Sequence, residues 1–165
     1  MVRTVFHFSF TVSDIEKSIR FYRDLLGMEL VHRQVQDNAY TCQLVGYPDA
    51  RLLVAQFKFR NLPAISGHVL ELVQYVRPPG VRLDTRTQNV GSAHMAFLVD
   101  DAEQEYERLT RLGVRFRNPP VAITEGINKG GKAAYFLDPD EITLELLQVP
   151  PQRLVTALFQ DQEAP

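Results

Sequence analysis

Two stretches of the chain alternate apolar and polar residues in the same order. The stretch HFSFTVSD at 7–14 and the stretch HMAFLVDD at 94–101 share the pattern H-x-x-F-x-V-x-D, at an offset of 94 − 7 = 87 residues. Alternation with period two predicts a strand, and in both places a pattern of period 3.6, which predicts a helix, follows it. The chain therefore contains an internal duplication.

Each of the two predicted helices carries one apolar stripe. The stripes consist of Ile15, Ile19, Tyr22 and Leu26 in the first helix, and of Ala102, Tyr106, Leu109 and Leu112 in the second. Gly27 and Gly113 follow directly and predict where the helices end. The helices are predicted to begin at capping boxes formed by Ser13 with Glu16 and by Asp100 with Glu103.

Both halves continue as strands, so each half has the order βαβββ and the fold class is α+β. We expect strands near residues 4–12, 28–35, 51–58 and 69–76, and again near 92–99, 114–117, 132–137 and 142–148. The first half is longer, because its histidine and glutamate are 71 − 7 = 64 residues apart, against 145 − 94 = 51 in the second. We place the 13 extra residues (64 − 51) within 34–50 and expect a short helix or an irregular loop there.

The same patterns divide the chain into four parts. Residues 1–76 form the first module, 77–91 a connector, 92–149 the second module and 150–165 a tail. The connector lacks periodicity and is rich in Pro, Gly and Asn, so we expect it to be exposed. In the tail, Leu154, Val155, Leu158 and Phe159 lie on one side of a predicted short helix.

Composition excludes several classes of function. With 165 residues, 45% of them hydrophobic and 23% charged, the chain has the composition of an ordinary soluble globular protein. A formal net charge of −2 leaves no basic surplus for nucleic acid. We expect no signal peptide and no membrane span, and hence a cytoplasmic protein. The single cysteine, Cys42, cannot form an internal disulfide and is predicted to be a small buried side chain.

Two glutamates interrupt apolar strand patterns in matching contexts. Glu71 lies in LELVQYV (70–76) and Glu145 in LELLQV (144–149). A buried carboxylate needs a cation or hydrogen-bond donors, and strand alternation puts His7 and His94 on the more polar faces of their own strands. Two imidazoles and two carboxylates suit one divalent ion of Zn, Ni, Co, Mn or Fe. The alternative is that each histidine is a satisfied core residue and each glutamate lies at an exposed strand edge.

Three other features are not assigned to this site. Strand alternation predicts that His68 lies on the opposite face of the strand from Glu71, and His32 belongs to a different strand, so neither is a predicted ligand. The segment GINKGGK (126–132) fits a phosphate-loop pattern, but Ala133 and a predicted strand follow it where Ser or Thr and a helix are needed. We interpret it as a loop over the mouth of a pocket.

The segments HFSFTVSDIEKSIRFYRDLLGMEL, GSAHMAFLVDD and KAAYFLDPDEITLELLQ resemble the vicinal oxygen chelate superfamily over residues 4–149. This superfamily includes glyoxalase I, methylmalonyl-CoA epimerase, extradiol dioxygenases, and fosfomycin and bleomycin resistance proteins. The resemblance implies two βαβββ modules that form a cupped mixed sheet around one metal ion. It places the ligands at His7, Glu71, His94 and Glu145, and it implies a small-molecule substrate and a homodimer.

The resemblance also implies a chemistry. The metal would chelate two neighbouring oxygens of the substrate and stabilise an enolate, while a ligand carboxylate, Glu145 or Glu71, moves the proton next to the carbonyl. By its position we take Glu145 as the base. Glu71 is similar to the second ligand of glyoxalase I, and its presence favours the isomerase and lyase branch.

Two positions depart from the lyases that use glutathione. Those enzymes usually carry Arg and Asn four residues past the first and second ligands, where this chain has Thr11 and Tyr75, so a glutathione adduct is disfavoured as the substrate. The alternatives within the same superfamily are an epimerase, an extradiol-type dioxygenase and a non-catalytic protein that binds a drug.

Overall fold

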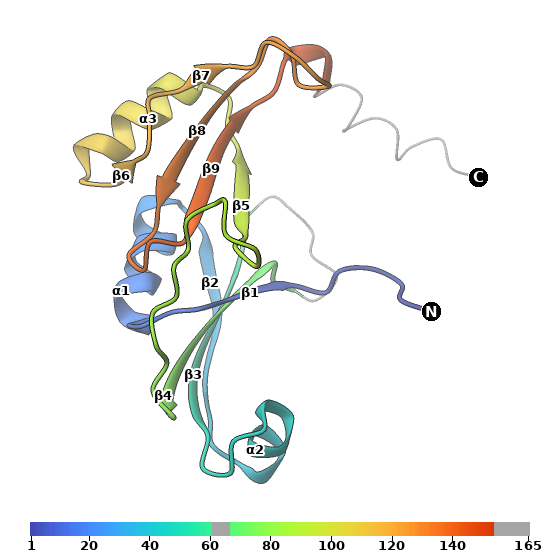
Figure 1. Cartoon of the computed structure of the whole chain (residues 1–165), viewed down its shortest axis with the longest axis vertical. Coiled ribbons are helices and arrows are strands. Elements are labelled where there is room, and N and C mark those ends of the chain that lie inside the picture. Colours follow the sequence, from blue (N-terminus) through green and yellow to red (C-terminus); the bar gives the residue numbers. More distant parts are fainter. Residues whose placement is uncertain (61–66, 154–165) are drawn as a thin grey trace. The chain divides into compact units, whose positions relative to one another are not determined.

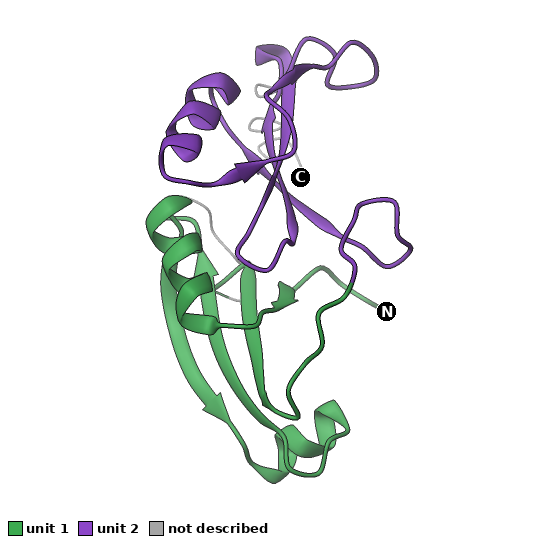
Figure 2. Cartoon of the chain, turned by 60° about the vertical axis from the view of Figure 1, so that its left-hand side comes forward, with its two compact units in different colours: residues 1–83 green, residues 84–165 purple. Residues whose placement is uncertain are grey.

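The computed structural model describes residues 1–60 and 67–153. The chain divides into two compact units, Met1–Leu83 and Asp84–Pro165, which are coloured green and purple in Figure 2. Each unit contains one mixed sheet with its own helix, so the α+β class and the two equivalent modules are confirmed. The boundary between the units lies inside the segment 77–91, which is mostly exposed, as expected.

The first unit contains a four-stranded sheet in the order β1-β4-β3-β2, in which β1 is parallel to β4 and the other pairs are antiparallel (Figure 1). Its elements are β1 (Phe8–Thr11), α1 (Ile15–Arg20), the π-helical turn η1 (Phe21–Leu25), β2 (Glu29–Gln36), α2 (Ala39–Val45), β3 (Arg51–Lys58) and β4 (Leu70–Arg77). Helix α2 confirms the short helix expected in the insertion. Cys42 in this helix is half-buried.

The second unit repeats this arrangement with the order β5-β9-β8-β6, and a short additional strand, β7, pairs with β8. Its elements are β5 (His94–Leu98), α3 (Ala102–Arg111), β6 (Arg115–Phe116), β7 (Val121–Ala122), β8 (Lys132–Leu137) and β9 (Thr143–Gln148). The predicted strand at 132–137 has the observed bounds, whereas the two-residue β7 was not predicted. The helix predicted at 154–159 lies outside the described residues.

In each unit the helix covers one face of the sheet and forms the core with it. Helix α1 contacts β3 and β4, and α3 contacts β8 and β9. The largest fully buried apolar side chains include Ile19, Tyr22, Phe57, Leu70 and Leu72 in the first unit, and Leu109, Phe136, Leu144 and Leu146 in the second. The central strands β4 and β9 thus place Leu70, Leu72, Leu144 and Leu146 toward the helices, and Glu71 and Glu145 on the opposite face.

The residues that cap the helices differ from the prediction by one position. The side chain of Asp14, rather than Ser13, accepts from the Lys17 amide at 3.0 Å, and Asp101, rather than Asp100, accepts from the Gln104 amide at 2.9 Å. The N-cap is the residue whose carboxylate reaches the third helical amide, and in both helices it is the residue directly after the predicted one.

Each unit also has a second helix cap, formed by a glutamine of its last strand. The side-chain oxygen of Gln74 accepts from the Ile15 amide at 2.9 Å, and that of Gln148 accepts from the Ala102 amide at 3.0 Å. Each glutamine follows its glutamate by three residues, 74 − 71 and 148 − 145, so the repeated E-x-x-Q pattern fixes the start of a helix on one face and presents a carboxylate on the other.

The predicted helix ends are confirmed. Gly27 and Gly113 have φ of 72° and 83°, a left-handed conformation that favours glycine. Leu112 at the end of α3 is exposed, so it does not belong to the buried stripe. Among the described residues, no helix is long and apolar enough to cross a membrane.

Candidate metal centre

In the first unit, β1 and β4 bring His7 and Glu71 together. The parallel register places Ser9 opposite Glu71, and His7, which directly precedes β1, lies two residues before Ser9. His7 Nε2 lies 3.9 Å from Glu71 Oε1, and both side chains are half-buried. The histidine therefore lies diagonally next to the glutamate, with one ring nitrogen facing the carboxylate.

In the second unit, His94 and Glu145 form the equivalent pair. Here Ala96 lies opposite Glu145 in the parallel register of β5 and β9, and His94 again precedes that residue by two. His94 Nε2 lies 3.2 Å from Glu145 Oε2. The duplication of the sequence thus produces the same pairing of imidazole and carboxylate in each unit.

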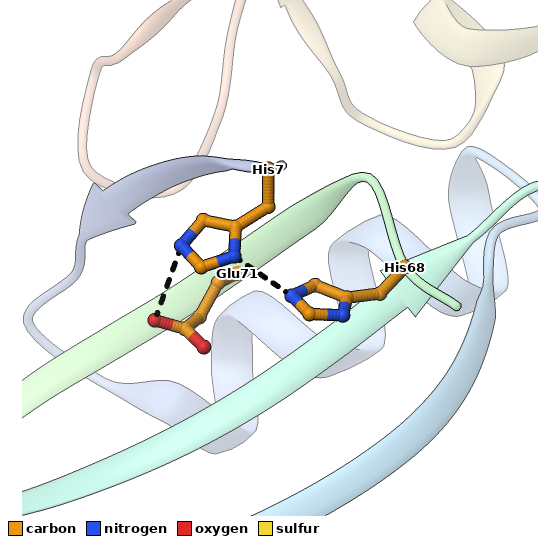
Figure 3. A group of neighbouring side chains, drawn as sticks. All are labelled: His7, His68 and Glu71. Atoms are coloured by element: carbon orange, nitrogen blue, oxygen red, sulfur yellow. Dashed lines mark hydrogen bonds and ion pairs between the residues drawn. The ribbon is translucent and has the colours of Figure 1, made fainter. Parts of the chain in front are cut away.

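His68 is the residue whose placement was predicted wrongly. It is 5% exposed, and its Nε2 lies 3.0 Å from His7 Nδ1, with the ring centroids 4.9 Å apart (Figure 3). Strand alternation does not apply to it, because β4 begins only at Leu70. One ligand-type atom from each of His7, His68 and Glu71 lies within 4.8 Å of the others. His32, by contrast, is an exposed residue of β2.

Glu71 is also held by a neighbouring strand. Gln56 lies opposite it in the antiparallel register of β3 and β4 and donates from Nε2 to Glu71 Oε2 at 2.9 Å. This bond satisfies one carboxylate oxygen, while the other, Oε1, faces His7. The hydrogen bond explains how a half-buried carboxylate is tolerated in an apolar strand.

Glu145 has a different neighbour at the equivalent position. Tyr135 lies opposite it in β8, and its ring centroid is 5.3 Å from that of His94. Burial and, second, the negative charge of Glu145 raise the pKa of Tyr135. The phenol therefore stays neutral at physiological pH. Neither Gln56 nor Tyr135 was predicted, because both belong to the site only through antiparallel register.

The donor chemistry fits a divalent transition metal. Imidazole nitrogens with carboxylate oxygens are the ligands of Zn and of related first-row ions. Ligands at about 2.1 Å from a shared ion lie within about 4.2 Å of each other. His7 Nε2 and Glu71 Oε1, which are 3.9 Å apart, lie within this limit, so one ion can bind both atoms.

The segment 126–132 does not form a phosphate loop. It connects β7 to β8, with Ile123 donating to Gly131 and Gly130 donating to Ile123 through the backbone, so a strand follows it instead of a helix. Lys132 pairs with Glu103 of α3. The strand predicted after this segment is confirmed as β8, and it stands where a phosphate loop needs a helix N-terminus.

Comparison with known proteins gives a consistent result. The family model of the glyoxalase/bleomycin resistance protein/dioxygenase superfamily matches residues 4–146. A 2-epi-5-epi-valiolone epimerase from Actinomyces sp is 30% identical over 147 residues, which cover 88% of this chain and 79% of the relative. A lactoylglutathione lyase from Neisseria meningitidis is 31% identical over 148 residues, covering 86% and 88%.

The fold is also found among solved structures. A glyoxalase family protein from Bacillus cereus superimposes with a TM-score of 0.71 at 19% identity, over 90% of this chain and 95% of the other. At this identity the likeness concerns the fold alone.

Proposed function

Because the chain belongs to the glyoxalase/bleomycin resistance protein/dioxygenase superfamily, we propose that it is a metal-dependent isomerase that moves a proton next to a carbonyl of a small substrate. The observation that carries this proposal is the pairing of histidine with glutamate at the same register position in both units. The proposed ligands of one divalent ion are His7, Glu71, His94 and Glu145. The ion would supply Lewis-acid stabilisation of the negative charge that develops on the carbonyl oxygen.

We assign the proton transfer to Glu145. A general base has to reach the substrate carbon with a carboxylate oxygen, and one oxygen of Glu71 is engaged by Gln56. Glu145 has instead the neutral phenol of Tyr135 opposite it, across β8 and β9. A hydrogen bond from this phenol would orient the carboxylate without neutralising it.

The substrate class we propose is a small polyhydroxy ketone that is epimerised at the carbon next to its carbonyl. The epimerase from Actinomyces sp supports this class. The position where the glutathione-dependent lyases usually carry asparagine holds Tyr75, whose ring makes an edge contact with Tyr47, with the centroids 6.2 Å apart. Two aromatic rings offer a surface for a compact ring-shaped substrate, and they lack the amide that would bind a glutathione carboxylate.

The metal is tested first. Protein purified without added metal is expected to contain a divalent transition ion by elemental analysis, and to bind zinc with a dissociation constant below the micromolar range after the ion is removed. No binding at micromolar zinc would favour the class of drug-binding proteins and would contradict the proposal.

The base is tested by exchange in D₂O. With 2-epi-5-epi-valiolone as the probe, NMR is expected to show deuterium entering at the carbon next to the carbonyl, and E145Q should lower this rate by about 10²-fold or more. E107Q is the matched control, because Glu107 lies 67% exposed on α3, paired with Arg111. Turnover of the methylglyoxal–glutathione adduct without exchange of the ketone would instead place the chain among the lyases.

We further propose a cytoplasmic homodimer. Sedimentation velocity at micromolar concentration should give twice the mass of the chain, and a monomer at that concentration would refute the dimer.

A further inference from the structure

The hydrogen bond between His68 and His7 defines the role of a residue that the repeat does not explain. We propose that His68 is a positioning residue that keeps the proton of His7 on Nδ1 and so leaves His7 Nε2 as the metal-facing lone pair. This inference rests on the proposed function, because it concerns the form in which His7 binds the ion.

The direction of the ring nitrogens carries the argument. His7 Nε2 faces Glu71, in the same way as His94 Nε2 faces Glu145, so Nε2 is the nitrogen directed toward the carboxylate in both units. A neutral imidazole has one donor and one acceptor. If Nε2 is to bind a metal, the proton of His7 must be on Nδ1, and the partner of that nitrogen must accept.

His68 is placed to accept this proton. Its Nε2 lies 3.0 Å from His7 Nδ1 (Figure 3), and in the proposed arrangement this Nε2 is the acceptor, with the proton of His68 on its own Nδ1. In the opposite arrangement, a proton on His68 Nε2 would be donated to His7 Nδ1, the remaining proton of His7 would be on Nε2, and the metal-facing position would be blocked. Ligand histidines are commonly fixed in this way through their second nitrogen.

The surroundings hold both rings in place. Phe6 contacts His68 edge-on, with centroids 6.0 Å apart and an interplanar angle of 87°, and contacts His7 at 5.6 Å and 63°. His68 itself is 5% exposed, so little water competes for the bond. The second unit lacks this device, since Ile142 occupies the equivalent position three residues before Glu145.

Two substitutions separate positioning from direct ligation. In H68Q, the amide oxygen can still accept from His7 Nδ1. In H68L, the acceptor is replaced by an apolar side chain that suits a buried position. H32Q removes an exposed histidine of β2 and serves as the control. Backbone ¹H–¹⁵N spectra establish that each variant is folded.

The first measurement uses the metal-free, ¹⁵N-labelled protein. Long-range ¹H–¹⁵N correlation of the imidazoles, with His7 assigned by its loss in H7Q, should show His7 protonated on Nδ1 in the wild type, in H68Q and in H32Q. In H68L both neutral forms should be populated. A wild-type His7 protonated on Nε2 would overturn the proposal.

The second measurement is zinc affinity by calorimetric titration. H68Q and H32Q should stay within about threefold of the wild type, and H68L should bind about 10–100-fold more weakly. An equal loss in H68Q and H68L would make His68 itself a ligand and refute positioning through a hydrogen bond.

The two measurements also separate this inference from the proposed function. If zinc fails to bind the wild type while His7 is protonated on Nδ1, the metal function is refuted and the positioning by His68 stands. If H68L does not fold, the zinc affinity of H68Q and the tautomer of His7 in the wild type still test the proposal.

Discussion

Glu71 and Glu145 occupy the same position in two copies of one pattern, yet they have different neighbours. Gln56 donates a hydrogen bond to Glu71, whereas Tyr135 lies opposite Glu145 and contacts His94. An amide holds a carboxylate oxygen as a fixed acceptor, while a phenol can also exchange a proton. The difference supports the roles proposed for the two acids, with Glu71 as a restrained ligand and Glu145 as the base.

The pKa of Tyr135 reports the charge of Glu145. Burial and the negative charge of Glu145 both raise it, because each disfavours the tyrosinate anion. In E145Q the charge is lost and the burial remains, so the pKa of Tyr135 should fall toward the ordinary tyrosine value while staying above it. A pH titration of ¹³C-labelled tyrosine by NMR measures this directly. E107Q should leave the titration unchanged. An unaltered pKa of Tyr135 in E145Q would show that the charge of Glu145 does not act on the phenol.

At the scale of elements, both modules begin their helix with two caps from different parts of the chain. An aspartate caps locally, and a glutamine of the last strand caps across the module. The glutamine bond couples the helix to the strand that carries the site glutamate. The start of the helix and the position of the carboxylate are thus fixed by one short segment, 71–74 in the first unit and 145–148 in the second.

The choice between two neighbouring aspartates at the start of α3 gives a test. D101A should lower the free energy of unfolding by about 1 kcal/mol, because the Gln104 amide loses its acceptor. D100A removes the same charge one residue earlier and should cost less than about 0.5 kcal/mol. Urea denaturation of both variants measures the difference. A larger loss in D100A would return the cap to the position that the sequence pattern suggested.

Gly131 in the loop between β7 and β8 is required for space. A β-carbon on this residue would lie 2.2 Å from the carbonyl oxygen of Gln148 and 3.1 Å from that of Asn128. G131A should therefore cost about 1–3 kcal/mol of stability, since backbone atoms have to move. G80A is the control, because its β-carbon would meet nothing within 4 Å. Equal urea midpoints for the two variants would show that the loop shifts freely.

At the scale of the whole molecule, each unit supplies one imidazole and one carboxylate. A tetrahedral site takes four donors, more than one such pair offers, and the proposed function therefore assigns both pairs to one ion. The proposed site therefore depends on both halves of the chain or of its dimer.

This dependence predicts a stoichiometry. The wild type should bind one divalent ion per chain, and H7A and H94A should each abolish binding at micromolar metal, as measured by calorimetry and elemental analysis. Two ions per chain, with one of them retained in each variant, would mean that each unit binds its own ion and would refute the shared site.

The sequence determined the duplication, the α+β class and the pairing of His7 with Glu71 and of His94 with Glu145. The first two follow from short-range periodicity, and the third was predicted from the repeated pattern together with the family resemblance. The helix ends at Gly27 and Gly113 could also be predicted from the local sequence. The residue that ends each helix has a left-handed backbone conformation, which favours glycine.

Only the tertiary structure decided the surroundings of the two pairs. Gln56 and Tyr135 join the site through antiparallel register, which depends on where each turn ends. His68 approaches His7 because β4 begins two residues after it, so alternation along the strand did not govern its direction. Register and strand boundaries are set by the packing of whole elements, and a pattern of single residues does not contain them.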